Sequence, residues 1–264
     1  MPVQVLNSIK TNWKETGKGE PVIFLHGVGM DHTMWEEQSD YLSSYYRVIV
    51  YDMLGHGLSE KPCKEYKLID FVNQLRELME HLSINKAHII GFSMGGLVAQ
   101  LFGIHCPDKA KTLTFMNTVA NRTKEQQQAV WSRVKQVEQK GHQAPIYAAI
   151  TRWFNESYRQ NHPEVIEKVR QRLENNDPFS YLKAYKVFAT ADQELWPLLS
   201  KITIPALIMT GKEDVGSTPQ MAEEMHEKLA KSELIIVPEY KHMLPIEGSE
   251  TVNKALHTFI QRNS

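Results

Sequence analysis

The sequence predicts an α/β protein in which a mostly parallel sheet is flanked by helices and interrupted by a helical insertion. Short apolar runs alternate with amphipathic stretches through the first half of the chain, as expected when helices cover both faces of a parallel sheet. Between residues 120 and 200 the strand-like runs disappear, and polar helical patterns with aromatic residues replace them. With 264 residues the chain is long enough for one large α/β unit with such an insertion.

The strands are predicted from six apolar runs. Four of them are typical of buried parallel strands, and two more follow the helical insertion. The runs cover residues 21–25, 47–51, 87–90, 112–116, 206–209 and 234–237. The segment before residue 20 is predicted as an antiparallel hairpin at the edge of the sheet. Apolar residues at helical spacing predict further helices at 68–82, 221–229 and 249–261.

The insertion is predicted as a helical cap over residues 120–200, so that residues 1–119 and 201–264 form the core domain. Val130, Val134 and Val137 make one apolar helical stripe within it, and residues 146–154 contain a second. Pro163 and Pro178 suit the first positions of two more helices, because the missing proline N–H is not needed there.

The composition argues against several classes of partner. A net charge of -1 and the lack of a long basic run argue against nucleic acid and anionic membranes. Cys63 and Cys106 are too few for a disulfide framework, and they form no Cys/His pairs at metal-ligand spacing, so no metal is expected. The chain lacks a leader-like start and any apolar run near the roughly 18 residues of a membrane span. We therefore expect a cytoplasmic protein with a small-molecule substrate and no membrane partner; its oligomeric state is not indicated.

Ser93 stands at the centre of Gly91-Phe92-Ser93-Met94-Gly95, directly after an apolar strand and before the helical run 96–102. This order of strand, sharp turn and helix is that of a nucleophile elbow, which pushes the central hydroxyl out over the carboxyl edge of a sheet. Small neighbours let the chain turn so tightly, and the helix N-terminus favours developing negative charge. The sequence therefore predicts that Ser93 is a catalytic nucleophile.

A serine hydroxyl needs a base within hydrogen-bond reach, and the base needs a carboxylate that orients it. In hydrolases with such an elbow the acid and then the histidine follow the serine along the chain, each just beyond a strand. Asp214 and His242 occupy these two positions. The neighbouring Glu213 is the alternative acid. An acid after the earlier strand would need a carboxylate near Asn117, and none is present.

The tetrahedral intermediate of acyl transfer needs hydrogen-bond donors for its oxyanion. Two backbone amides are predicted to supply them. Met94 follows the nucleophile directly, and Val28 lies in a glycine-containing loop just beyond the first buried strand. We expect His26, in the same loop, to order the loop through its ring.

The whole chain resembles the α/β-hydrolase family. The matching motifs are H-G-V-G-M, D-M-L-G-H-G-L-S, G-F-S-M-G-G, G-K-E-D-V-G-S-T-P and H-M-L-P-I-E. Within the family it is most similar to 3-oxoadipate enol-lactonases and related carboxylesterases, which have a four-helix cap. The resemblance implies a mostly parallel eight-stranded sheet with an inserted cap, no cofactor, a triad of Ser93, Asp214 and His242, and an oxyanion hole of Val28 and Met94.

Departures from the family pattern leave the substrate open. Leu54 stands where many relatives have arginine, and the cap aligns poorly beyond a segment similar to Arg152-Trp153-Phe154. Trp153 is the best cap candidate for facing the pocket, and Phe154, His26 and Met243 are further pocket candidates. The methionines beside the motifs indicate an apolar acyl site.

The leading functional hypothesis is hydrolysis of a small carboxylic ester or lactone through an acyl-enzyme. A carbon–carbon bond hydrolase of ring-cleavage products keeps the same serine but usually has tryptophan after its histidine, where this chain has Met243. A cofactor-free perhydrolase would use the same triad. A ligand-binding module that retains the fold without turnover is the non-enzymatic alternative.

Overall fold

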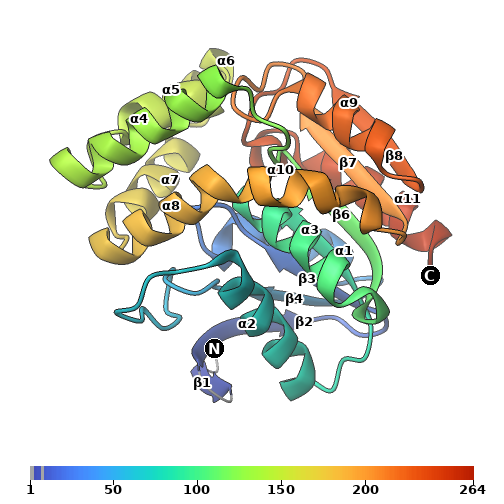
Figure 1. The fold of residues 1–264 in the computed structure, drawn as a ribbon. Coiled ribbons are helices and arrows are strands. Elements are labelled where there is room, and N and C mark those ends of the chain that lie inside the picture. Colours follow the sequence, from blue (N-terminus) through green and yellow to red (C-terminus); the bar gives the residue numbers. More distant parts are fainter. Residues whose placement is uncertain (1–2, 7–8) are drawn as a thin grey trace.

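A twisted, mostly parallel sheet forms the centre of the computed structural model, which describes residues 3–6 and 9–264 (Figure 1). Its strand order is β1-β2-β4-β3-β5-β6-β7-β8. The strands are β1 (Val3–Leu6), β2 (Ile9–Thr16), β3 (Pro21–Leu25), β4 (Arg47–Tyr51), β5 (Ala87–Phe92), β6 (Ala110–Met116), β7 (Ala206–Gly211) and β8 (Ser232–Val237). Strands β3 to β8 pair in parallel, which confirms the predicted sheet.

The antiparallel part of the sheet lies at one edge. Strand β2 pairs antiparallel with β4, and the short β1 pairs antiparallel with β2. Seven strands, β2 to β8, make the main sheet, and β1 extends it to eight. The predicted antiparallel pairing at the edge is therefore confirmed, and residues 7–8 between the two strands lie outside the described residues.

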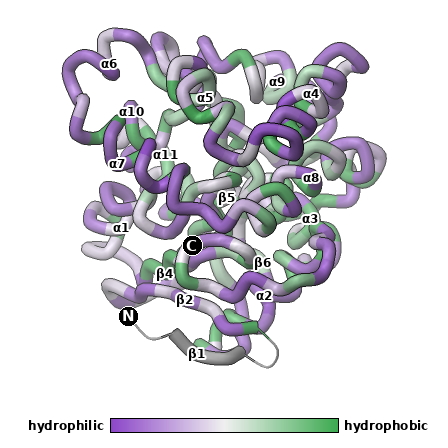
Figure 2. Tube along the Cα trace, turned by 90° about the vertical axis from the view of Figure 1, so that its left-hand side faces the viewer, coloured by the Kyte–Doolittle hydropathy of each residue, from purple (hydrophilic) through white to green (hydrophobic). Residues whose placement is uncertain are grey.

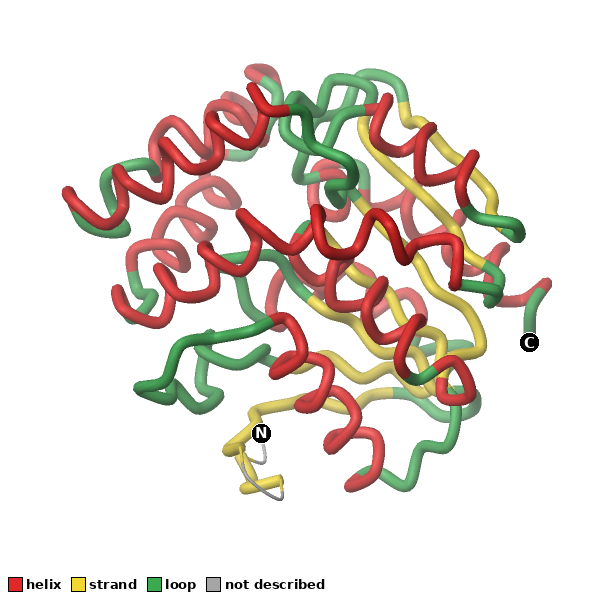
Figure 3. Tube along the Cα trace, viewed as in Figure 1, coloured by secondary structure: helices red, strands yellow, loops and turns green. Residues whose placement is uncertain are grey.

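Helices cover both faces of the sheet (Figure 3). The core helices are α1 (Glu36–Leu42), α2 (Leu68–His81), α3 (Met94–His105), α9 (Pro219–Lys228), α10 (Leu244–Glu247) and α11 (Ser249–Arg262). Alternate residues of each strand serve the two faces. In β3, Ile23 belongs to the apolar core cluster that also holds residues of α2, α3 and α9, whereas Phe24 belongs to the cluster that holds residues of α1 and α11.

Hydropathy follows these layers. Apolar residues gather in the central strands and α3, and hydrophilic ones on the outer helices such as α4 and α6 (Figure 2). Helix α3 is buried from Met94 to Gly103, because it lies between the sheet and neighbouring helices. No helix of the described chain is long and apolar enough to span a lipid bilayer.

Five helices stand between β6 and β7 in the chain. They are α4 (Lys124–Lys140), α5 (Ile146–Trp153), α6 (Glu156–Asn161), α7 (Pro163–Glu174) and α8 (Pro178–Leu195). The predicted helix starts at Pro163 and Pro178 are confirmed. The short α6 was not predicted, because its six residues bury none of their side chains and so leave no apolar stripe. In Figure 1, α4 to α7 lie to one side of the sheet, and α8 leads from them toward its centre, where it packs against α3.

Candidate active site

Ser93 occupies the sharp turn between β5 and α3. Its backbone has φ 53° and ψ -114°, a strained conformation for a residue with a side chain. Two hydrogen bonds, one to the last residue of β6 and one to the segment after it, hold this turn. The Ser93 N–H donates to the Met116 carbonyl at 2.9 Å, and the Thr118 hydroxyl donates to the Ser93 carbonyl at 2.7 Å. The neighbouring strand therefore fixes the position of the nucleophile candidate.

Two glycines make the turn sterically possible. A Cβ atom on Gly91 would lie 2.2 Å from the Gly95 carbonyl oxygen. A Cβ atom on Gly95 would lie 2.3 Å from the carbonyl oxygen of Leu25, at the end of β3. Both distances are far below any real contact and involve main-chain atoms that cannot swing aside. The glycine pattern around Ser93 thus has the packing reason that the sequence indicated.

Asp214 lies in the loop after β7 and is 3% exposed, whereas Glu213 beside it is exposed. Its Oδ1 accepts hydrogen bonds from the Gly216 and Ser217 amides at 2.8 and 3.0 Å. Its Oδ2 accepts one from the Asn117 side chain at 2.9 Å. Burial alone would raise the pKa of Asp214, but His242 and these donors together lower it. Asp214 is therefore held as an ionised carboxylate.

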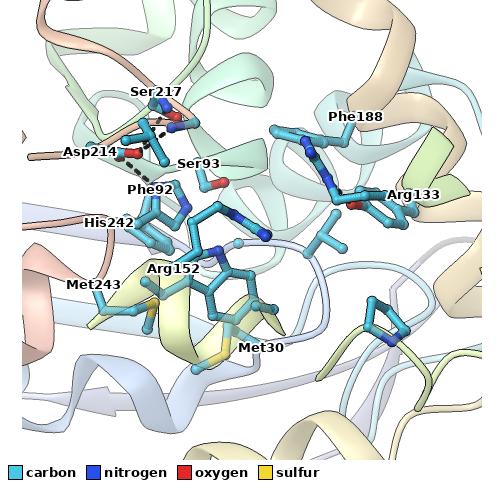
Figure 4. Close-up of a pocket in the computed structure, with 18 of the residues that line it drawn as sticks. Met30, Phe92, Ser93, Arg133, Arg152, Phe188, Asp214, Ser217, His242 and Met243 are labelled. Carbon is cyan, nitrogen blue, oxygen red and sulfur yellow. Dashed lines mark hydrogen bonds and ion pairs between the residues drawn. The ribbon is translucent and has the colours of Figure 1, made fainter. Parts of the chain in front are cut away.

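His242 lies in the loop after β8, and its Nδ1 is 2.6 Å from Asp214 Oδ2. An ionised carboxylate can only accept, so Nδ1 carries a proton, and in the neutral form of the ring Nε2 then has the free lone pair. The imidazole ring packs between Phe92 and Trp153, with ring centroids 5.0 and 5.8 Å away. Ser93, Asp214 and His242 line one pocket, where Figure 4 shows them together. This arrangement suits a nucleophile, its base and an orienting acid.

The loop after β3 runs directly beside Ser93. A Cβ atom on Gly27 would lie 3.3 Å from Ser93 Cβ, and Gly27 and Val28 both line the pocket. Met94 is the first residue of α3, so its N–H has no acceptor within that helix. The amides of Val28 and Met94 are thus on the two segments that flank the serine, as the sequence predicts.

Of the four further pocket candidates, two line the pocket and two do not. Trp153 and Met243 line it. His26 is fully buried beneath it: Nδ1 bonds the Gly27 carbonyl, and Nε2 accepts from the Met53 N–H at 2.9 Å.

Burial lowers the pKa of His26 to about 4, so the ring is neutral and orders its loop. Phe154 follows the end of α5 and is fully buried against Tyr158. The prediction of pocket positions for His26 and Phe154 is therefore corrected, because both rings are used in packing and loop order.

Two features of the site escaped sequence reasoning. The sequence near Asn117 shows no carboxylate, but the Asn117 side-chain amide donates to Asp214 from the segment after β6, the strand between those that lead to the serine and the acid. In α4, Gln126, Ala129 and Arg133 line the pocket at helical spacing. That periodicity is the signal that could have found this face, beside the apolar stripe of Val130 and Val134.

Near the site, the described residues contain one cluster with metal-ligand geometry, formed by Asp31, His32 and Asp52. Its oxygens already have protein partners. Asp52 bonds His32 Nδ1 at 2.6 Å and also accepts from the Asn12 side chain and the Leu58 amide. Asp31 pairs with Arg172 at 2.9 Å. The cluster therefore joins loops under the sheet edge, and we assign no metal to it.

Comparison with known proteins identifies the family. A family model described as the alpha/beta hydrolase fold matches residues 20–249 of the chain. This protein belongs to that family. The elbow and the mostly parallel sheet agree with the assignment, and the protein is a hydrolase.

Individual relatives are similar over nearly their whole length. One is (E)-2-((N-methylformamido)methylene)succinate hydrolase of Acinetobacter baylyi, 32% identical over 98% of this chain and 97% of the relative. Another is 3-oxoadipate enol-lactonase 2 of the same organism, 30% identical over 91% of this chain and 88% of the relative. The solved enol-lactonase of Burkholderia xenovorans LB400 superposes with a TM-score of 0.91 at 26% identity, covering 98% of this chain and 100% of that one. The predicted likeness to enol-lactonases is confirmed.

Substitution of Gly95 tests the steric account of the elbow. Gly95→Ala should lower the free energy of unfolding by more than about 3 kcal/mol, because the new Cβ meets main chain rather than a flexible side chain. Gly141→Ala is the matched control, since its positive φ adds strain of about 1–3 kcal/mol but nothing lies within 4 Å of its Cβ. Urea unfolding followed by circular dichroism measures both. Equal losses in the two variants would contradict the account.

Proposed function

We propose that this hydrolase cleaves small carboxylic esters or lactones with Ser93 as nucleophile, His242 as general base and Asp214 as the orienting acid. The observation that carries the proposal is the 2.6 Å contact between His242 Nδ1 and Asp214 Oδ2 in the pocket that Ser93 lines. It leaves Nε2 as the basic atom of the ring, which is what activation of a serine hydroxyl requires.

The reaction proceeds through an acyl-enzyme. As Ser93 Oγ attacks the carbonyl carbon, its proton passes to His242 Nε2, and Asp214 stabilises the imidazolium that forms. The amides of Val28 and Met94 bind the oxyanion, which disappears when the carbonyl re-forms and the bond to the alcohol oxygen breaks. His242 returns the proton to that oxygen. A water molecule then attacks the acyl-enzyme by the same steps, and the carboxylic acid product is released.

The relatives support a substrate of this class. Two of them, a substituted succinate hydrolase and an enol-lactonase, are by name hydrolases of small carboxylic acid derivatives. Helices α4, α5, α7 and α8 contribute to the pocket lining. We therefore propose that residues 120–200 form a cap that selects the substrate, above a core of residues 1–119 and 201–264. We also propose that the enzyme is cytoplasmic.

Two alternative reactions would use the same three residues. A carbon–carbon bond hydrolase and a perhydrolase differ from an esterase in the bond broken or in what intercepts the acyl-enzyme. A panel of short 4-nitrophenyl esters, lactones, a ring-cleavage dienoate and a peroxide-dependent halogenation assay separates them. Turnover of esters or lactones is expected, and turnover of the dienoate alone would favour the carbon–carbon reaction.

Replacement of the nucleophile gives the first test. Ser93→Ala should lower kcat for a 4-nitrophenyl ester by roughly 10⁶-fold, as removal of a triad serine does, while the protein stays folded. Stopped assays at high enzyme concentration, with circular dichroism as the fold control, measure this. Substantial residual activity that serine-directed inhibitors still block would contradict the assignment.

The identity of the acid is tested by neighbouring substitutions. Asp214→Asn should lower kcat by roughly 10⁴-fold, because the amide favours the wrong tautomer of His242. Glu213→Gln is the matched control and should change kcat little, since this side chain is exposed. Steady-state kinetics on both variants measure the ranking. The reverse ranking would move the acid to residue 213.

A further inference from the structure

The pocket contains more positive charge than the proposed chemistry uses. Arg122, Arg133 and Arg152 all line it, and Asp214 is the only carboxylate among the described lining residues. A charged side chain withdrawn from water is unfavourable unless it is paired or hydrogen-bonded. The partners of each arginine therefore decide whether the excess charge is real.

Arg122 is neutralised within the protein. Its guanidinium lies 2.6 Å from Asp192 Oδ1, and both side chains are almost fully buried. It also donates to the carbonyl of Phe188 at 3.0 Å and lies over the ring of that residue. Arg122 thus joins α8 to the start of the insertion and has little charge to offer a ligand.

Arg133 and Arg152 have no such counter-ion. Arg133 Nε donates to the Tyr185 hydroxyl at 3.1 Å, which is a neutral partner. The side chain of Arg152 makes no hydrogen bond or ion pair with any residue in the described ranges 3–6 and 9–264. Burial and the charge of Arg133 lower the pKa of Arg152, since both disfavour its protonated form. The two guanidinium groups therefore repel each other across a partly desolvated space.

Asp214 compensates this charge only in part. Its negative charge opposes the lowering of the Arg152 pKa, but no hydrogen bond or ion pair joins these two side chains within the described residues. Both of its oxygens are occupied by His242, Asn117 and the amides of residues 216 and 217. Neither oxygen is therefore left to bond a guanidinium group directly. The positive charge of Arg133 and Arg152 is consequently left for a group that enters the pocket.

The positions of the two arginines suit a ligand that also reaches Ser93. Figure 4 shows Arg152 extending into the middle of the pocket, with His242 and Asp214 on one side and Arg133 and Phe188 on the other. Arg152 comes from α5 and Arg133 from α4. The end of α5 is tied to the histidine loop, because the Met243 N–H donates to the Trp153 carbonyl at 3.1 Å. The backbone at Arg152 is therefore held close to the histidine loop.

We propose that Arg133 and Arg152 bind a free carboxylate on the substrate, so that the enzyme selects anionic esters or lactones over neutral ones. The inference rests on the proposed function, in which Ser93 opens the ester. Guanidinium groups bind carboxylates through two parallel hydrogen bonds, which fixes orientation as well as charge. When the free carboxylate is on the acyl part of the substrate, hydrolysis yields a dicarboxylate. The new carboxyl group then lies at Ser93 and the original one at the arginines.

The kinetic test compares two esters that differ in one charge. Mono-4-nitrophenyl adipate carries a terminal carboxylate, and 4-nitrophenyl heptanoate has an apolar end of similar length. We expect the wild type to prefer the adipate ester in kcat/KM, and Arg152→Met to reduce that preference ~10- to 100-fold, the range for a lost charged hydrogen bond. Arg133→Met should reduce it less, and Arg152→Lys should restore part of it.

Arg170→Met is the control for a cap arginine outside the pocket. Arg170 lies outside the pocket lining, its side chain is 44% exposed, and it pairs with Glu167 and Glu174 on its own helix, so its loss should leave the adipate preference unchanged. Equal hydrolysis of both esters by the wild type, or an equal fall in preference for Arg152→Met and Arg170→Met, would overturn the proposal. A preference for the heptanoate ester would do the same.

A binding measurement keeps this inference separate from the proposed function. Calorimetry with adipate on the Ser93→Ala protein needs no turnover, and binding should weaken ~10-fold or more when Arg152→Met is added. If adipate binds in this way but no ester or lactone is cleaved, the carboxylate site stands and the esterase proposal fails. If esters are cleaved but adipate affinity is unchanged by substitution of either arginine, the carboxylate site is wrong and the esterase proposal is unaffected. Binding of inorganic phosphate but not adipate, with the same Arg152 dependence, would contradict the carboxylate assignment.

Discussion

The strained turn at Ser93 is the constraint on which the rest of the site depends. A serine at φ 53° is strained, so this conformation persists only when the surrounding structure holds it in place. The end of β6 and the segment after it hold the turn through hydrogen bonds to the N–H and carbonyl groups of Ser93, and β3 meets Gly95 so closely that no side chain fits. Both supports come from the strands on either side of β5, so the packing of the sheet itself aims the serine side chain.

Parallel strands explain how residues far apart in sequence meet there. The carboxyl ends of β3, β5, β6, β7 and β8 lie along one edge, and the loop after each contributes to the site. The order of contributions along this edge is Val28, Ser93, Asn117, Asp214 and His242. Asn117 occupies the place between serine and acid, and its amide helps keep Asp214 ionised. The insertion then adds the opposite wall, where the arginines of α4 and α5 face these loops.

Much of the core could be predicted because each element has a local signal. Apolar runs marked β3 to β8, and the glycines around Ser93 marked the elbow. Distant contacts have no such signal. Nothing local tells that Asn117 reaches Asp214, that the Phe154 ring turns away from the pocket, or that Arg133 lacks a counter-ion whereas Arg122 has Asp192. Substrate choice depends on these distant contacts. The sequence motifs therefore predict the proposed mechanism but not the charge of the pocket.

The central claim is that the elbow presents an activated Ser93 hydroxyl to an electrophile in the pocket. Labelling with diisopropyl fluorophosphate, followed by mass spectrometry of the intact protein and its peptides, tests that claim most directly. The account predicts one phosphoryl group per chain, carried by Ser93, with label and activity loss rising together. A folded protein that takes no label, or takes it on a different serine, would contradict the account.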